Sequence, residues 1–150
     1  MSREAIASWF FAIVVVRRGD RFLFVHEGKH GQTWYLPAGR VEPGETLADA
    51  ARRETLEETG VPVVLDGVLR VEHSPGPPAR VRVFFHAHPA DDTPAKSRPD
   101  EHSLEARWVT LAELRGLPQR GAEALAIVAA VLGGAPVLPL AVVCAEGEAW

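Results

Sequence analysis

The segment GRVEPGETLADAARRETLEETGV, residues 39–61, predicts a turn followed by a helix. Pro43-Gly44 is typical of a turn. Thr46 has a side chain suited to capping the first turn of a helix, and Gly60 can adopt the left-handed conformation that ends many helices. The predicted helix therefore runs from just after Thr46 to just before Gly60, and the rest of the chain is organised around it.

Three glutamates share one face of this predicted helix. Glu54, Glu57 and Glu58 stand at positions i, i+3 and i+4, and residues so spaced are neighbours on a helix. Their arc continues the one on which Leu47 and Ala50 lie, so the face begins apolar and ends acidic. The carboxylates are thus expected at the edge of a core, where repulsion and dehydration are costly. A bound cation would relieve both costs.

Arg53 precedes Glu57 by four residues and is expected to clamp one carboxylate through a bidentate contact, which leaves others free for a metal. Ligation by oxygen alone suits Mg²⁺ or Mn²⁺. Taken in isolation, an Arg-Glu-x-x-Glu-Glu run more often marks a solvated, salt-bridged helix face. The residues around it decide between the two interpretations.

The whole segment resembles the box of the Nudix hydrolase family, G-x5-E-x7-R-E-U-x-E-E-x-G-U, in which U is aliphatic. The matching residues are Gly39, Glu45, Arg53, Glu54, Glu57, Glu58, Gly60 and Val61. Thr55 occupies the first U position and is the single departure. The resemblance implies an α+β fold, the Nudix α/β/α sandwich with a mixed β-sheet between helical layers. It also implies metal-dependent hydrolysis of a nucleoside diphosphate linked to another group.

The resemblance also implies roles for individual residues. Glu54, Glu57 and Glu58 are the expected ligands of Mg²⁺ or Mn²⁺, together with the carbonyl oxygen of Gly39, where glycine allows close approach. Arg53 is expected to orient the carboxylates. Glu45, elsewhere in the box, is expected to brace that arginine or to bind an outer metal. The candidates for the catalytic base are Glu57 and Glu58 inside the box and Glu101 outside it, and the sequence does not choose among them.

The extra-box candidate comes from the acidic stretch before Trp108. Several relatives take a glutamate from six positions before a conventional tryptophan, and this chain has His102 there. Glu101 and Glu105 lie on either side of it. We favour Glu101 because it belongs to a loop, whereas Glu105 is expected in the strand leading to Trp108. A histidine base at position 102 is the chemical alternative.

The candidate substrate-binding residues are Lys29, Trp34, Tyr35 and Arg40. Lys29 lies in a polar loop and is a candidate contact for phosphate or base, although such a loop can equally be a mobile surface connection. Trp34 and Tyr35 are candidates for stacking on a base, with core packing as the alternative.

The segment from residue 33 to residue 46 resembles the family branch that includes an animal 8-oxo-dGDP phosphatase. Oxidised or ordinary purine nucleoside di- and triphosphates are therefore the first expectation for the substrate, and ADP-ribose or another sugar nucleotide is the second. A Nudix domain that binds a nucleotide without turnover is the alternative from another functional class.

Composition limits the remaining possibilities. A chain of 150 residues predicts one domain over residues 1–150, and a net charge of −4 argues against a broad basic surface for nucleic-acid polymers. The apolar run over residues 6–16 contains Ser8 and is too short to span a membrane. The single cysteine, Cys144, is expected to be buried and suits a reducing compartment, so the cytoplasm is the expected location.

The rest of the chain predicts mostly strands. The expected strands are residues 9–16 and 21–26, joined by a hairpin at Gly19-Asp20, a strand, a turn and a strand over 62–73, and a strand over 80–88. The continuous apolar run of the first strand predicts burial on both faces. His86 and His88 point to one side of their strand and would form two corners of a metal site, but a third ligand is missing.

The C-terminal part predicts a short capped helix after Thr110, a longer helix over residues 121–132 that covers the other side of the sheet, and an apolar tail over residues 134–150. Two prolines in the tail confine it to a sheet edge or to irregular docking. Docking on its own domain and docking along a partner subunit are both open, so a homodimer is possible.

Overall fold

The structure is a computed structural model that describes residues 2–150. Its β-sheet is built around the strand β1 (Ser8–Arg18). β1 runs parallel to β6 and antiparallel to β2 and β4, so the sheet is mixed as predicted. Residues 12–16 are buried because helices cover both faces. The other strands are β2 (Arg21–His26), β3 (Trp34–Tyr35), β4 (Ala38–Arg40), β5 (Val63–Ser74), β6 (Ala79–Pro89), β7 (Glu105–Thr110) and β8 (Leu138–Pro139).

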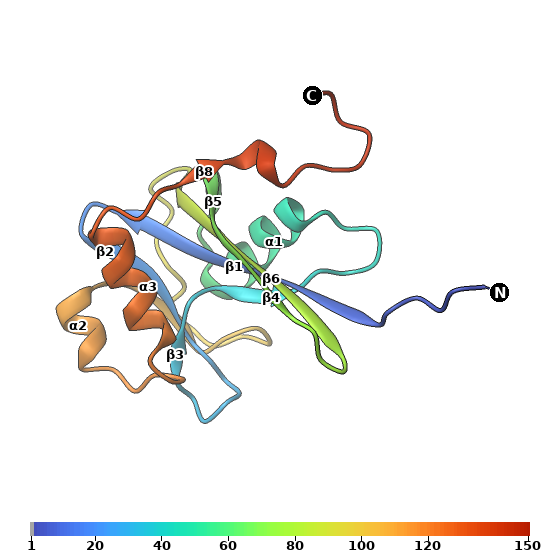
Figure 1. Cartoon of the computed structure of the whole chain (residues 1–150). Helices are drawn as coiled ribbons and strands as arrows, with labels where there is room; N and C mark the ends of the chain where they lie inside the picture. The colour runs from blue at the N-terminus through green and yellow to red at the C-terminus, as the bar shows by residue number, and fades with distance from the viewer. Residues whose placement is uncertain (1) are drawn as a thin grey trace.

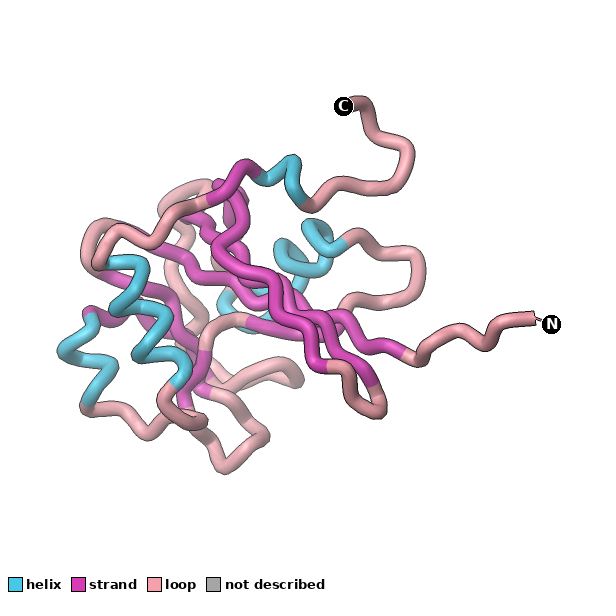
Figure 2. The backbone as a smooth tube through the Cα atoms, viewed as in Figure 1, coloured by secondary structure: helices cyan, strands magenta, loops and turns pink. Residues whose placement is uncertain are grey.

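The strand order is β3-β2-β1-β6-β5-β8, with β4 paired to β1 and β7 paired to β2. The helix α1 (Leu47–Thr59) lies on one side of the sheet, and α2 (Leu111–Arg115) and α3 (Glu123–Leu132) lie on the other (Figure 1). Two hydrophobic clusters fill the two layers, one under α1 and one under α3. The predicted α/β/α sandwich is therefore confirmed, and Figure 2 shows how strands dominate it.

Local sequence explains both ends of α1. The Thr46 hydroxyl accepts a hydrogen bond from the Asp49 amide at 3.1 Å. Gly60 has φ 73° and donates its amide hydrogen to the Leu56 carbonyl at 2.8 Å, which closes the helix. Thr55 is fully buried, and its hydroxyl donates to the Ala51 carbonyl at 2.7 Å. The departure from the aliphatic pattern therefore leaves no polar group unpaired in the core.

The segment after α1 corrects one expectation. The predicted strand, turn and strand form the single strand β5, with register shifts on either side of Asp66 and Leu69. β6 pairs along the whole length, which makes the irregularities bulges rather than a turn. Gly67 does not form a turn but allows the backbone of Leu138 to approach β5 closely, because a Cβ atom at Gly67 would lie 2.1 Å from the Leu138 carbonyl oxygen.

The C-terminal tail docks on its own domain. β8 pairs with the outer edge of β5 through Gly67 and Val68, and a 3₁₀ turn, Leu140–Val142, follows. The prediction for Cys144 is wrong, because the chain leaves the sheet after this turn and the thiol is exposed. Within residues 2–150, no helix is long and apolar enough to cross a membrane.

Candidate active site

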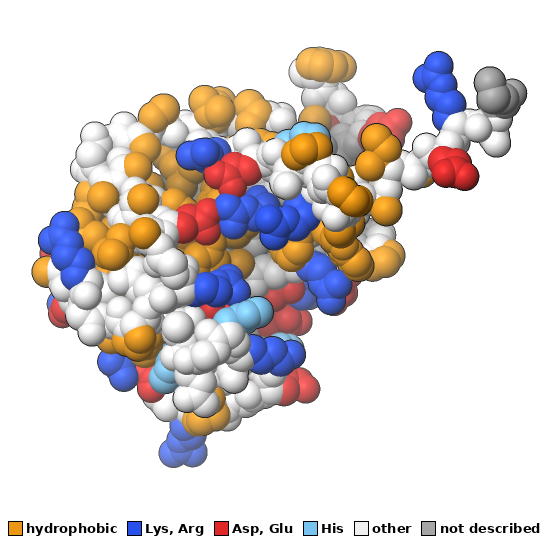
Figure 3. Space-filling model, turned by 60° about the horizontal axis from the view of Figure 1, so that its bottom comes forward, with side chains coloured by type: hydrophobic (Ala, Val, Ile, Leu, Met, Phe, Trp, Pro, Cys, Tyr) orange, Lys and Arg blue, Asp and Glu red, His pale blue; other side chains and the backbone are white. Residues whose placement is uncertain are grey.

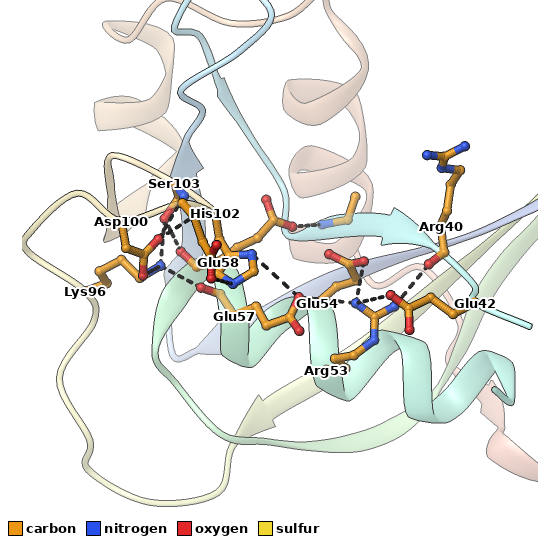
Figure 4. Close-up of polar contacts among 12 residues, drawn as sticks. Arg40, Glu42, Arg53, Glu54, Glu57, Glu58, Lys96, Asp100, His102 and Ser103 are labelled. Carbon is orange, nitrogen blue, oxygen red and sulfur yellow. Dashed lines mark hydrogen bonds and ion pairs between the residues drawn. The ribbon is translucent and has the colours of Figure 1, made fainter.

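Arg53 lies at the centre of the carboxylates that α1 presents (Figure 4). Its Nε and Nη2 atoms donate to the two oxygens of Glu45 at 2.6 and 2.9 Å, which is the bidentate clamp. Its Nη1 atom donates to Glu54 at 2.8 Å and to Glu57 at 3.2 Å. One guanidinium group therefore holds three of the box carboxylates in fixed relative positions.

The same guanidinium group ties the preceding turn to the helix. Nη2 of Arg53 also donates to the Arg40 carbonyl oxygen at 3.1 Å. Hydrogen bonds from Arg53 hold the pKa of Glu45 below its usual range, so this carboxylate stays ionised as a structural partner.

Gly39 allows the backbone of β4 to approach α1. A Cβ atom on this residue would lie 2.0 Å from the carboxyl carbon of Glu54 and 2.2 and 2.4 Å from its oxygens. No side chain fits in that space, so the glycine is required wherever Glu54 keeps its position.

Glu58 differs from the other box carboxylates because no cationic side chain contacts it in the described residues. Its Oε1 atom accepts a hydrogen bond from the Ala38 amide at 2.9 Å. Burial raises the pKa of Glu58 to about 8, and the nearby charges of Glu54 and Glu27 act in the same direction. Burial also raises the pKa of Glu54, although its contact with Arg53 opposes the shift.

Glu27 joins this group, and sequence reasoning missed it. It follows directly after β2, and its side chain is only 15% exposed. Burial raises its pKa. The sequence signal that could have identified Glu27 is the alternation of side chains between the two faces of β2. Phe22 and Phe24 pack under α3, whereas Leu23 packs under α1. Every second residue from Leu23 onward therefore faces α1, and that series reaches Glu27.

These carboxylates line a cleft of about 430 Å³. Its walls are formed by the loop after β2, the start of β4, the acidic face of α1 and the loop before β7. The lining residues are Glu27, Gly28, Lys29, His30, Ala38, Glu54, Glu58, Asp100, Glu101, His102 and Ser103. The cleft thus contains Lys29, one of the predicted substrate-binding residues.

The other predicted substrate-binding residues lie elsewhere. Arg40 is directed away from the carboxylates, and its guanidinium group lies 4.8 Å from the centre of the Trp9 ring (Figure 4). Trp34 is buried and stacks on His26 with ring centres 4.7 Å apart. Tyr35 is buried as well, but it lines a second cleft.

Lys96 fastens the loop before β7 to the end of α1. Its ammonium group donates to the Glu57 carbonyl at 2.6 Å and to the Ser103 hydroxyl at 3.0 Å, and it pairs with Asp100 at 2.7 Å. The Ser103 hydroxyl in turn donates to the Glu58 carbonyl at 2.7 Å. The loop before β7, which is far from α1 in the sequence, is therefore held against the carboxylates of that helix.

This fastening determines how the extra-box candidates lie. Nδ1 of His102 is 3.8 Å from the Glu57 carboxylate, whereas the Glu101 side chain is 86% exposed and lies 3.4 Å from the other ring nitrogen of His102. Glu105 is in β7, as expected, and pairs with Arg107. The structure therefore brings the His102 ring beside the box residue Glu57, while the Glu101 side chain is exposed and Glu105 pairs within β7.

The histidine pair on β6 has an acidic partner that the sequence did not reveal. Asp66, at a bulge of β5, lies 2.8 Å from Nδ1 of His86 and 2.6 Å from Nδ1 of His88. Among residues 2–150, no set of three or more His, Cys, Asp or Glu side chains already stands in position to hold a metal ion. The two histidines are thus held by a carboxylate.

The box residues do fit a cation by their chemistry. Their donors are carboxylate oxygens, which hard divalent ions prefer. Among the described residues, one oxygen of Glu27 is buried without any hydrogen-bond partner, and Glu58 is buried with no cationic side chain in contact, so that the charge of Lys96 offsets its burial only in part. A positive charge in this cleft would compensate both groups, although Arg53 now holds Glu54 and Glu57.

A second cleft of about 490 Å³ adjoins the first, because His30 and Ala38 line both. Phe11, Ile13 and Tyr35 supply apolar and aromatic walls. Its charged residues are Arg80, Arg82, Arg120 and Glu123. Figure 3 shows one face of the molecule on which Lys and Arg side chains form a band with acidic side chains beside it.

Glu123 connects the walls of the second cleft. It accepts a hydrogen bond from the Tyr35 hydroxyl at 2.5 Å and from the guanidinium group of Arg82, which also contacts Glu72. The hydrogen bonds from Arg82 hold the pKa of Glu123 below its usual range. The aromatic and cationic walls are therefore fixed relative to one another.

Comparisons with known proteins agree with this geometry. The family model described as the NUDIX domain matches residues 10–131. Over 98 residues, the chain is 39% identical to the 8-oxo-dGDP phosphatase of Homo sapiens, covering 63% of this chain and 30% of that protein. Over 108 residues, it is 35% identical to the NAD-capped RNA hydrolase NudC of Chromobacterium violaceum, covering 71% of this chain and 39% of the relative.

The chain therefore spans well under half the length of these two curated relatives. Among solved structures, a NUDIX hydrolase from Nitrosomonas europaea superposes with a TM-score of 0.78 at 23% identity, covering 93% of this chain and 99% of that one. The match to the family model includes the box, strands β2 to β7, helices α1 and α2, and most of β1 and α3. The chain belongs to the NUDIX domain family.

Proposed function

We propose that this protein hydrolyses the pyrophosphate bond of nucleoside diphosphate-X compounds with the help of Mg²⁺ or Mn²⁺. The observation that carries the proposal is the state of the carboxylates. Arg53 holds part of the set in place, while Glu58 and Glu27 are buried in the cleft that Glu54 also lines, and no cationic side chain of the described residues donates a hydrogen bond to either. Members of this family generally use divalent metals, and the cleft offers oxygen ligands for one.

The residues that would hold the metal are Glu54, Glu57 and Glu58, with the Gly39 carbonyl as a further candidate. A bound divalent ion would neutralise phosphate oxygens and lower the pKa of a water molecule that attacks phosphorus. Glu58 would lose its proton as the metal binds, because a carboxyl group must be ionised to act as a ligand. Arg53 would keep its neighbours in place throughout.

The loops on either side of the cleft supply the remaining roles. Lys29 lies on the wall formed by the loop after β2, where an ammonium group can bind a phosphate oxygen of the substrate. For the base that activates water we retain Glu57, Glu58 and Glu101 as candidates. The proximity of His102 to Glu57 supports His102 over Glu101 as the group from outside the box.

We propose oxidised or ordinary purine nucleoside di- and triphosphates as the first substrate class. The 39% identity to an 8-oxo-dGDP phosphatase supports it, and so does the second cleft, where Phe11 and Tyr35 offer surfaces for a purine ring. ADP-ribose or another sugar nucleotide is the second candidate. The second cleft also supports this candidate, because a terminal sugar needs room beyond the diphosphate and arginine N–H groups can donate hydrogen bonds to sugar hydroxyls.

Two further expectations belong to this proposal. We propose a cytoplasmic location, which a single cysteine suits. A homodimer stays a prediction, and since the tail occupies the edge of its own sheet, such a dimer would form through another surface.

The test is a panel of nucleotides incubated with the purified protein in the presence and absence of Mg²⁺. We expect release of monophosphate or phosphate from a purine nucleoside diphosphate-X compound only with the metal. Glu57→Gln should reduce turnover by about 100-fold or more. Turnover of Glu57→Gln at the level of the unmodified protein would contradict the mechanism. Nucleotide binding without any hydrolysis would instead support a non-catalytic domain.

A further inference from the structure

Glu27 carries a buried atom that the fold leaves without a partner. Its Oε1 atom is inaccessible to solvent and accepts no hydrogen bond from any described residue. Buried carboxylate oxygens are normally paired, because an uncompensated one loses its interactions with water and gains nothing in return. An orphaned oxygen of this kind needs an explanation.

The position of Glu27 is imposed by the sheet rather than by its own side chain. Its amide donates to the Thr33 carbonyl at 2.9 Å, which continues the pairing of β2 beyond His26. Its second oxygen, Oε2, lies 3.7 Å from the guanidinium group of Arg120, which is beyond hydrogen-bond distance. Neither contact supplies a donor to Oε1.

The two basic groups nearest to the α1 carboxylates, Arg53 and Lys96, are already engaged. The Arg53 guanidinium group donates to Glu45, Glu54, Glu57 and the Arg40 carbonyl. Lys96 binds the carbonyl of Glu57 and the loop before β7. Glu27, Glu54 and Glu58 line one cleft, and Lys29, which also lines it, forms no ion pair with them among the described residues. The three carboxylates therefore offer a site for a cation from outside the protein.

We propose that Glu27 is a further ligand of the divalent cation, contributed by the end of β2 from outside the box. It binds the ion directly or through one of the water molecules that Mg²⁺ and Mn²⁺ commonly retain. This inference rests on the proposed metal dependence of the site. It adds to the site a carboxylate that lies 27 residues before Glu54 and has no place in the box pattern.

The experiment measures metal binding without any nucleotide. Mn²⁺ is titrated into the protein at fixed ionic strength, and free Mn²⁺ is followed by electron paramagnetic resonance. We expect Glu27→Gln to weaken Mn²⁺ binding by about 10-fold to 100-fold, because it keeps the shape but removes a charged ligand. Glu146→Gln removes the same charge from the exposed tail and should bind Mn²⁺ as the unmodified protein does.

Thermal unfolding in the presence of EDTA shows whether each variant is folded. Glu27→Gln should be about as stable as the unmodified protein without metal, because Oε1 makes no hydrogen bond and the ion pair of Oε2 with Arg120 is long. If the glutamine variant does not fold, Glu27→Ala takes its place in the titration. A folded Glu27 variant that binds Mn²⁺ within twofold of the unmodified protein would overturn the assignment, and so would an equal loss in Glu146→Gln.

These outcomes are separable from those of the proposed function. A protein that binds Mn²⁺ through Glu27 but hydrolyses no nucleotide would refute the activity and leave the ligand assignment intact. A protein that hydrolyses nucleotides while Glu27→Gln binds Mn²⁺ normally would refute only the ligand assignment.

Discussion

The acidic residues around α1 form two groups that the fold treats differently. Glu45, Glu54 and Glu57 surround Arg53, with donor–acceptor distances from 2.6 to 3.2 Å. Glu58 and Glu27 are buried beside them, and within residues 2–150 no cationic side chain donates a hydrogen bond to either. We call the first set the framework group, because Arg53 fixes the positions of its members, including the proposed metal ligands Glu54 and Glu57. We call the second set the binding group, because its members would gain a cation in contact only when a ligand binds.

The pKa values express the same difference. Hydrogen bonds from Arg53 lower the pKa of Glu45, whereas burial raises the pKa of Glu58 to about 8. Within the same box, Glu45 is therefore held in its ionised form, whereas Glu58 retains a proton more readily and would lose it beside a bound cation.

Arg53→Lys should produce the largest effect, because it breaks the framework group. A lysine keeps the charge but cannot form the bidentate contact with Glu45 while reaching Glu54. We expect turnover to fall about 100-fold and the free energy of unfolding to fall by about 2 kcal/mol. The measurements are steady-state kinetics and urea denaturation.

The matched control is Arg52→Lys. Arg52 is the preceding residue, and its pair with Asp49 lies on the exposed side of α1 at 3.3 Å. Exposed pairs contribute little, so both quantities should stay near those of the unmodified protein. If Arg52→Lys lowered turnover and stability as much as Arg53→Lys, the special role of Arg53 in holding the carboxylates would be contradicted.

Gly39→Ala should have the next largest effect. The new methyl group would occupy the space of the Glu54 carboxylate, which must then move away from Arg53. We expect turnover to fall about 10-fold and the free energy of unfolding to fall by about 1–3 kcal/mol. Gly116→Ala is the control, because its nearest neighbour would be 3.4 Å away. Full activity of Gly39→Ala would show that the glycine is dispensable.

Glu58→Gln tests the binding group through pH. Since the folded protein holds a proton on Glu58 that the unfolded chain releases above its ordinary pKa of 4.5, this group makes the metal-free protein less stable as pH rises from 4.5 to about 8. The slope contributed is at most about 1.4 kcal/mol per pH unit. Unfolding with EDTA at several pH values should show a shallower decline for Glu58→Gln.

Added Mn²⁺ should flatten the decline of the unmodified protein in the same way, because the metal favours the ionised carboxylate. Identical pH profiles for the unmodified protein and Glu58→Gln would mean that Glu58 titrates normally. In that case the contrast between the two groups would rest on geometry alone.

Lys96→Met should have the smallest effect, because it loosens the loop that carries His102 without touching the carboxylates themselves. We expect a several-fold loss of turnover and a stability loss of about 1 kcal/mol. Hydrogen exchange of the amides in residues 97–104 should become faster. Lys96→Arg, which keeps a cation, should lose less, and unchanged exchange in Lys96→Met would show that the loop is held by other contacts.

Local sequence predicted the framework well. Caps, spacing and the box placed α1 and the acidic face on residues 46–60, and all of these contacts lie within 20 residues of one another. The position of Glu27 and the contacts of Lys96 could not be predicted from local sequence. Glu27 lies 31 positions before Glu58, with which it lines the cleft, and Lys96 lies 39 positions after Glu57, whose carbonyl it binds.

Other differences have similar causes. β5 continues through Gly67 because β6 and β8 flank it, and neither partner is visible in the local pattern. The exposure of Cys144 depends on where the chain leaves the sheet after Leu140. Asp66 could not be assigned to the histidine pair, since a bulge directs it there.

The close approach of Leu138 to Gly67 has a consequence for how copies of the protein behave toward one another. Without β8, that part of β5 would present unpaired backbone groups at the sheet margin, and such margins recruit strands from neighbouring molecules. The tail therefore protects this edge of the sheet from pairing with strands of other molecules. The proline at position 139 limits further strand addition beyond it, because it offers no amide hydrogen.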